Sequence, residues 1–138
     1  MLEITENVLL MDSDETTEKL SALKELGIRL AIDDFGTGYS SLNYLQRFPI
    51  DIVKIDKSFV DGVDAGLEGS AIVRAAVQLG QTFRLETVAE GIEAESQARE
   101  LRSLECELGQ GFFFAKPLDA EGIERFLESE RGHGSETD

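Results

Sequence analysis

The chain has 138 residues, enough for one domain, and combines 41% hydrophobic with 30% charged residues. This composition is typical of a folded protein, because it provides enough apolar surface to offset the entropy of the chain. Its 28 acidic residues against 13 Lys and Arg give a formal net charge of −15, which excludes nucleic-acid polymers and anionic membrane surfaces as general partners, since both are bound by clustered basic residues.

Features that mark exported or membrane proteins are missing from the sequence. No apolar run reaches the roughly 18 residues of a membrane helix, and the first residues include acids where a signal peptide carries basic side chains. A single cysteine, Cys106, excludes an internal disulfide. We therefore expect a cytoplasmic protein with no membrane segment in this chain.

Short runs rich in β-branched residues alternate with helical patterns, and this alternation predicts five βα units. The first helix is expected to end at Gly27, and Pro49 is expected to stop the second. The predicted strands are 2–5, 29–34, 51–56, 84–89 and 110–115. The predicted helices are 14–26, 40–47, 68–79 and 94–104, followed by a last helix that Asp119 caps.

Apolar stripes on two of these helices are expected to face a core. They comprise Ile72, Val73, Ala76 and Val77 in the third helix, and Ile123, Phe126 and Leu127 in the last. After one domain over residues 1–129, residues 130–138 are predicted to form an acidic, flexible tail.

The spacing of the units narrows the fold class. Roughly 27 residues per unit is close to the ~31 expected when a ~250-residue barrel is divided by eight. We therefore predict an α/β fold, a partial TIM-like (β/α)8 barrel of about five βα units that lacks the amino-terminal strands. An open doubly wound sheet fits the same alternation and remains the alternative.

Charged or polar residues lie in or just after every predicted strand, where βα proteins place their chemistry. They are Glu3, Glu6, Asp33, Asp34, Lys54, Asp56, Glu90, Glu93 and Gln110. Two carboxylates about 4 Å apart repel by roughly 4 kcal/mol at an effective dielectric near 20, so converging acids need a cation. Oxygen ligands favour Mg²⁺ or Mn²⁺, and a pair of such ions would suit phosphoester hydrolysis.

Taken singly, each of these residues also has a structural interpretation. Glu3 could lie on the solvent face of an edge strand, and Asp33 with Asp34 could cap a turn. Lys54 and Asp56, two residues apart, could form a surface ion pair worth at most about 1 kcal/mol. The Gly36-Thr37-Gly38 string alone is a weak match to a phosphate-binding loop.

Five segments also carry the motifs of a known family, in the same order. They read LEITE (2–6), DDFGTGYSSL (33–42), VKIDKSFV (53–60), VAEGIE (88–93) and GQGFFFAKPL (109–118). These strings resemble the EAL-domain phosphodiesterases that cleave cyclic di-GMP. The resemblance covers about residues 2–129 and implies a (β/α)8-like barrel that hydrolyses cyclic di-GMP to linear pGpG.

The resemblance also implies a role for each matching position. It makes Glu3, Asp33, Asp34 and Glu90 metal ligands, with Glu90 assigned as a ligand or general base, and Lys54 the residue that orients the catalytic water. Further roles concern the surroundings of the site. They are Glu6 as a brace for the loop 35–41 with Gly36, Thr37 and Gly38, Gln110 as a ligand contact, and Asp56 and Glu93 as supporting residues.

Parts of the family pattern are absent from the chain. The Glu-Ala-Leu signature, an Asn-bearing strand and a phosphate-binding arginine do not occur. The chain therefore resembles the second half of the domain, with an incomplete first metal site and impaired catalysis expected. The alternatives are an inactive module that binds cyclic di-GMP or a protein, and an inert fragment whose open sheet self-associates or forms a homodimer. The resemblance also leaves room for regulatory or GGDEF-type domains in the parent protein.

Overall fold

The structure is a computed structural model that describes residues 1–5, 14–35 and 42–133. Its strands are β1 (Leu2–Thr5), β2 (Leu30–Phe35), β3 (Ile52–Ile55), β4 (Glu86–Ala89) and β5 (Leu108–Gly109). Its helices are α2 (Asp14–Glu25), α3 (Leu42–Arg47), α4 (Lys57–Val60), α5 (Ala71–Phe83), α6 (Glu95–Ser103) and α7 (Ala120–His133). No helix in these ranges combines the length and apolar character that a membrane span needs.

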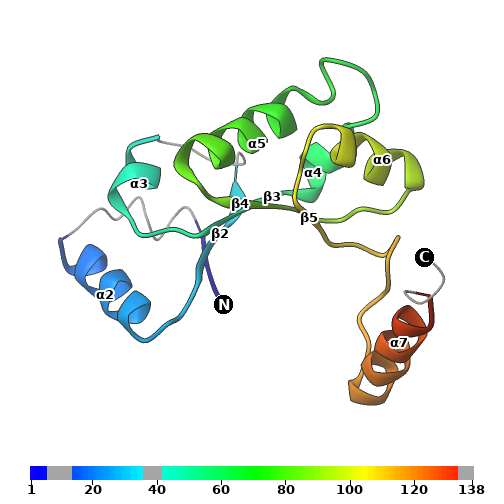
Figure 1. Cartoon of the computed structure of the whole chain (residues 1–138). Coiled ribbons are helices and arrows are strands. Elements are labelled where there is room, and N and C mark those ends of the chain that lie inside the picture. Colours follow the sequence, from blue (N-terminus) through cyan, green and yellow to red (C-terminus); the bar gives the residue numbers. More distant parts are fainter. Residues whose placement is uncertain (6–13, 36–41, 134–138) are drawn as a thin grey trace.

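The five strands form one parallel sheet in the order β1-β2-β3-β4-β5. Helices α4, α5 and α6 lie on one side of it (Figure 1). Each strand pairs with the next strand of the chain, as in a βα barrel, whereas a doubly wound sheet reverses its strand order at a switch point. The predicted α/β class is therefore confirmed, and the order favours the barrel over the doubly wound alternative.

The hydrophobic core lies between the sheet and the helices. Leu30, Ile32 and Ile55 are fully buried, and Val73 and Val77 of α5 pack into the same cluster. Leu30, Ile32 and Ile55 are Leu or β-branched residues, the side chains typical of buried strands in a parallel sheet.

The apolar stripe predicted for α5 is only partly correct. Val73, Ala76 and Val77 are buried, but Ile72 is 45% exposed, because it lies on the flank of the helix away from β3 and β4.

The end of α2 follows the prediction. Gly27 has φ +80°, its N–H bonds to the Lys24 carbonyl at 2.9 Å, and the Ile28 N–H bonds to the Leu23 carbonyl at 3.3 Å. This is the Schellman pattern, in which a residue in the left-handed region closes the helix.

Helix α5 ends in the same way with Arg84 at φ 58°. It therefore runs to Phe83, beyond the predicted end at residue 79. Strand β4 starts at Glu86 rather than at Arg84, because Arg84 is occupied in closing the helix.

Strands β3 and β5 also differ from their predicted ranges. Asp56 lies outside β3: its Oδ2 accepts the Ser58 N–H at 2.9 Å and so caps α4, a four-residue helix that no periodicity announced. Strand β5 is Leu108–Gly109 instead of 110–115. The following residues turn, because the Phe113 N–H bonds to the Ile92 carbonyl at 2.9 Å.

Helix α7 confirms one expectation and contradicts two. The Asp119 cap is confirmed, since its Oδ1 accepts the Gly122 N–H at 2.8 Å. The helix then continues to His133, so the predicted flexible tail 130–138 is helical over its first four residues. Its apolar residues Ile123, Phe126 and Leu127 are exposed rather than buried, because α7 stands apart from the sheet (Figure 1).

Candidate functional site

Side chains from consecutive βα units meet at one end of the sheet. Glu3 comes from β1, Asp33 from β2, Lys54 from β3, and Glu90 directly follows β4. The strands are parallel and the sequential strand order makes these four units neighbours. Their site residues are not level in the register, since Glu3 lies opposite Ala31 and Asp33 opposite Thr5. The predicted convergence of these residues is thus present in the structure.

Lys54 is the centre of this group. Its ammonium is hydrogen-bonded to Oε1 of Glu3 and lies 2.5 Å from Oε1 of Glu90. The Lys54 side chain is 6% exposed, whereas Glu3 is 41% and Glu90 20% exposed. The alternative of a surface ion pair with Asp56 is therefore wrong, because Lys54 points into the acid cluster.

Asp33 completes the cluster through Glu90. The Asp33 carboxylate lies close enough to Glu90 to influence its ionisation. Burial raises the pKa of Glu90, and the Asp33 carboxylate adds to that rise, while Lys54 opposes it. Glu90 is thus a carboxylate with an increased tendency to take up a proton.

The pKa of the Lys54 ammonium is also raised, but for a different reason. Burial alone would lower its pKa, but the hydrogen bonds that the ammonium donates to Glu3 and Glu90 outweigh burial, and the pKa of Lys54 is raised. Lys54 therefore keeps its positive charge at neutral pH. In this arrangement the lysine supplies the cation that the converging acids need.

The donor chemistry of the cluster fits a divalent cation. Glu3, Asp33 and Glu90 offer carboxylate oxygens, the ligands that Mg²⁺ and Mn²⁺ prefer. In residues 1–5, 14–35 and 42–133, however, no three such groups surround one point closely enough to hold a metal ion. The side chain of Asp34 and the predicted site residues Glu6, Gly36, Thr37 and Gly38 lie outside the described residues.

Gln110 follows β5 and lies beside the cluster rather than in it. Its N–H bonds to the Ala89 carbonyl at 2.8 Å, and its own carbonyl accepts the Ile92 N–H at 3.0 Å. It lines a cavity of about 220 Å³ whose other lining residues are Lys57, Gly91, Glu93, Gly111 and Phe112.

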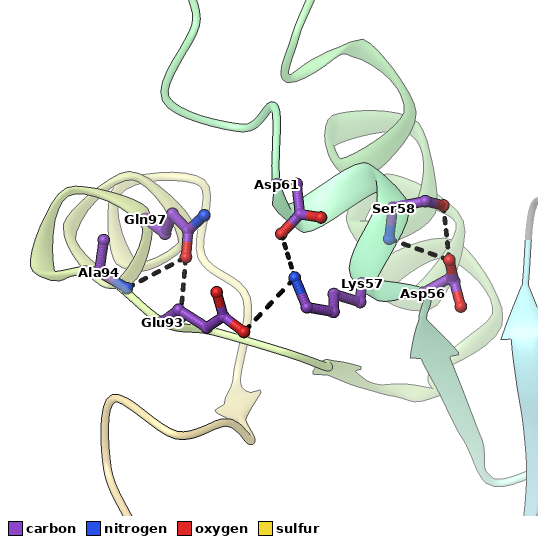
Figure 2. Close-up of polar contacts among 7 residues, drawn as sticks. All are labelled: Asp56, Lys57, Ser58, Asp61, Glu93, Ala94 and Gln97. Carbon is purple, nitrogen blue, oxygen red and sulfur yellow. Dashed lines mark hydrogen bonds and ion pairs between the residues drawn. The ribbon is translucent and has the colours of Figure 1, made fainter.

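The two supporting residues have different partners. Asp56 caps α4, as described above. Glu93 lies 3.6 Å from the ammonium of Lys57, as Figure 2 shows. Lys57 was not predicted as a site residue, although it stands three positions after Lys54 in the same motif. Its contact with the segment after β4 depends on the folded arrangement, which no local pattern reveals.

Comparison with known proteins identifies similar sequences. A family model described as the EAL domain matches residues 1–117. The cyclic di-GMP phosphodiesterase NbdA of Pseudomonas aeruginosa is 45% identical over 130 residues, which cover 94% of this chain and 17% of NbdA.

Solved structures of EAL proteins are also similar to this chain. The PaMucR phosphodiesterase in complex with c-di-GMP matches with a TM-score of 0.82 and 43% identity, over 88% of this chain and 49% of that one. The manganese and cyclic di-GMP complex of Klebsiella pneumoniae BlrP1 matches with a TM-score of 0.76 and 37% identity, over 83% and 29%. The chain thus spans about a sixth of NbdA and half of the PaMucR structure, and its sheet corresponds to part of a TIM-like barrel.

Proposed function

The chain belongs to the EAL-domain family, and we propose that it supplies part of a divalent-metal phosphodiesterase site that hydrolyses cyclic di-GMP to linear pGpG. The observation that carries this proposal is the buried Lys54 held between Glu3 and Glu90 at the end of the sheet. The names of NbdA and PaMucR support the substrate, and the BlrP1 complex supports a divalent metal.

Glu3, Asp33, Asp34 and Glu90 are the residues that would hold Mg²⁺ or Mn²⁺. The bound cation would supply charge neutralisation at a phosphoryl oxygen and a more acidic water. The chain's own contribution begins with the charge of Lys54. An anionic dinucleotide approaching a chain of net charge −15 would need the bound cation and Lys54 together to offset the acids of the site.

Two side chains then have separate roles in hydrolysis. The Lys54 ammonium donates a hydrogen bond to the attacking water and fixes its direction. The water oxygen forms a bond to phosphorus while the bond to one ribose oxygen breaks. Glu90, whose pKa is raised by burial, accepts the water proton, and the ribose oxygen leaves as a hydroxyl after protonation from solvent. Gln110 is proposed to contact the ligand from the adjoining cavity.

The test is metal-dependent cleavage in the full-length protein that contains this chain. We expect cyclic di-GMP to be converted to pGpG with Mg²⁺ or Mn²⁺, and Glu90→Gln to lower kcat by at least about 100-fold, as expected for loss of a general base. Glu86→Gln is the matched control, because Glu86 also belongs to the β4 segment but pairs with Arg29 on the surface at 3.0 Å. It should keep kcat within about twofold.

Two results would contradict the proposal. One is the absence of metal-dependent cleavage, and the other is full activity of Glu90→Gln. Calorimetric titration with cyclic di-GMP distinguishes the remaining class of function. Binding without turnover would favour an inactive binding module over an enzyme.

A further inference from the structure

The segment that connects β4 to α6 carries Glu90 into the candidate site. Its backbone is anchored to the strands on either side. The Glu90 N–H donates to the Ile55 carbonyl at 2.9 Å, and the Ile92 N–H donates to the Gln110 carbonyl at 3.0 Å. Between these anchors the chain must turn sharply, and the turn is made at Gly91.

Gly91 adopts φ +72°, in the left-handed region. A Cβ atom placed there would lie 2.6 Å from Cβ and 2.8 Å from Cδ of Lys57. The aliphatic stem of Lys57 therefore fills the space directly over Gly91. The atoms involved belong to the base of the side chain, which has little freedom to move away.

The far end of the segment is held as well. Oε1 of Gln97 accepts the N–H groups of Glu93 at 2.9 Å and Ala94 at 3.2 Å, and Gln97 is 8% exposed. The Glu93 carboxylate reaches back to the Lys57 ammonium, which also bonds to Asp61 at 2.7 Å (Figure 2). Lys57 thus contacts the segment at both Gly91 and Glu93.

We propose that Lys57 is a positioning residue for the candidate site, acting through the packing of its stem on Gly91. Residues of the β3–α4 unit would then hold the end of β4 in two ways, with Lys54 bonding to the Glu90 carboxylate and Lys57 covering the next residue. The role of Lys57 in turnover rests on the proposed phosphodiesterase function. The packing by which Lys57 holds the segment between β4 and α6 in place does not depend on that function.

Packing outweighs charge in this contact. Lys57, Glu93 and Asp61 are each about half exposed, and ion pairs with such exposure contribute little. A lysine stem that lies on backbone excludes water and restricts motion whether or not its end is charged. A side chain of similar length without charge should therefore replace Lys57, and a truncated one should not.

Hydrogen exchange of the backbone amides tests the hold on the segment in this chain without any ligand. We expect Lys57→Ala to lower the protection factors of the Glu93 and Ala94 amides about tenfold. Lys57→Met, which keeps the stem and removes the charge, should stay within about twofold of wild type. Lys19→Ala is the control, since Lys19 also forms an exposed i,i+4 ion pair, in which the lysine follows its partner Glu15 on α2.

Either of two exchange results would overturn the hold on the segment. Unchanged protection in Lys57→Ala would show that the stem is dispensable. Equal loss in Lys57→Met and Lys57→Ala would show that the charge, rather than the stem, holds the segment.

Kinetics in the full-length protein test the positioning role. Misplacement of a catalytic group lowers kcat more than substrate binding, so Lys57→Ala should lower kcat about tenfold with KM within about twofold, and Lys57→Met should restore kcat. A rise in KM without a change in kcat, or unchanged kinetics, would overturn the positioning role of Lys57. If wild type does not cleave cyclic di-GMP, the proposed function fails and with it the positioning role, while the exchange results still decide the hold on the segment.

Discussion

Lys54 Nζ and Glu90 Oε1 lie 2.5 Å apart although one group sits on β3 and the other follows β4, and both side chains are at least four-fifths buried. The contact links the side chain of one strand to the residue that follows its neighbour in the sheet. Breaking a buried ion pair leaves an uncompensated charge in a poorly solvated place, which costs more than the pair itself contributes. Stability and function therefore depend on the same lysine.

Lys54→Met should destabilise the fold. We expect the free energy of unfolding to fall by about 2–3 kcal/mol, less than for a fully buried pair because Glu3 is partly exposed. The measurement is urea denaturation without divalent metal. Excess Mn²⁺ should restore part of the loss, because a bound cation replaces the missing charge.

Lys19→Met is the control for loss of an exposed lysine, since Lys19 is 72% exposed. It should leave the urea midpoint unchanged. A Lys54→Met variant as stable as wild type, and indifferent to Mn²⁺, would show that the acids do not depend on this lysine.

Gly91→Ala should lower the free energy of unfolding more than the same change at another glycine with positive φ. At Gly91 the new methyl meets both the backbone strain of φ +72° and the Lys57 stem. Gly27 has φ +80° with no atom within 4 Å of the position of a Cβ. We expect unfolding free energy to fall by about 1 kcal/mol for Gly27→Ala and by about 2–3 kcal/mol for Gly91→Ala.

Thermal and urea unfolding of the two variants compare these costs directly. Equal losses would mean that the contact between Gly91 and Lys57 is not tight. Such a result would weaken the positioning role of Lys57 as well.

Asp51 predicts a pH dependence of stability. Burial would raise its pKa, but two 2.7 Å contacts from Lys24 Nζ and the Leu30 N–H at 2.8 Å outweigh burial, and the pKa of Asp51 is held below its usual range. A carboxyl whose pKa is lower in the folded state stabilises the protein above its unfolded value, about 3.9. That contribution is lost as the pH falls through the folded pKa.

Asp51→Asn should therefore lower the free energy of unfolding by about 1–2 kcal/mol at pH 6, with a smaller difference from wild type at pH 3. Urea denaturation at both pH values gives the comparison. Glu15→Gln, which removes an exposed partner of Lys19, should leave the midpoint unchanged at both. A difference that widens on acidification would contradict the assignment.

The exposed apolar surface predicts self-association of the chain. Phe112 and Phe113 follow β5, whose outer edge is open in the described sheet, and Phe126 and Leu127 lie on α7. Contiguous apolar surface and open strand edges favour association. We expect light scattering to show a mass that rises with concentration, and Phe126→Ser with Leu127→Ser to reduce it.

Glu128→Gln on the same helix serves as the control and should not change the association. A compact monomer at all concentrations would refute the expectation of a homodimer or larger assembly. It would leave the sheet and the acid cluster as described.

The order of elements and the meeting of Glu3, Asp33, Lys54 and Glu90 could be predicted from sequence. Parallel βα units place the residues at their strand ends along one edge, so position in the motif determines position in space. The same reasoning did not show which acid each residue contacts, because Lys54 was equally compatible with Asp56 two residues away.

Other features depend on contacts between distant segments. Helix α4 has four residues, too few for a periodic pattern, and the role of Lys57 follows from where Gly91 lies. The amphipathic pattern of α7 specifies an apolar face but not the segment that covers it. The end of α5 and the start of β4 differ from their predicted positions, because the left-handed residue between them is Arg84 and not the glycine that would have marked the turn in the sequence.

The sequential strand order has a consequence for how the protein folds. Each of β2 to β5 pairs with the strand that precedes it in the chain, so each of these strands can be added to the edge formed by its predecessor. Glu3 on β1 meets its counter-charge only when β3 has paired, because its bond to Lys54 spans 51 positions. The electrostatic frustration between the acids of β1 and β2 is therefore relieved by the pairing of β3. In this way the buried lysine favours the correct strand pairing as well as the arrangement of the acids.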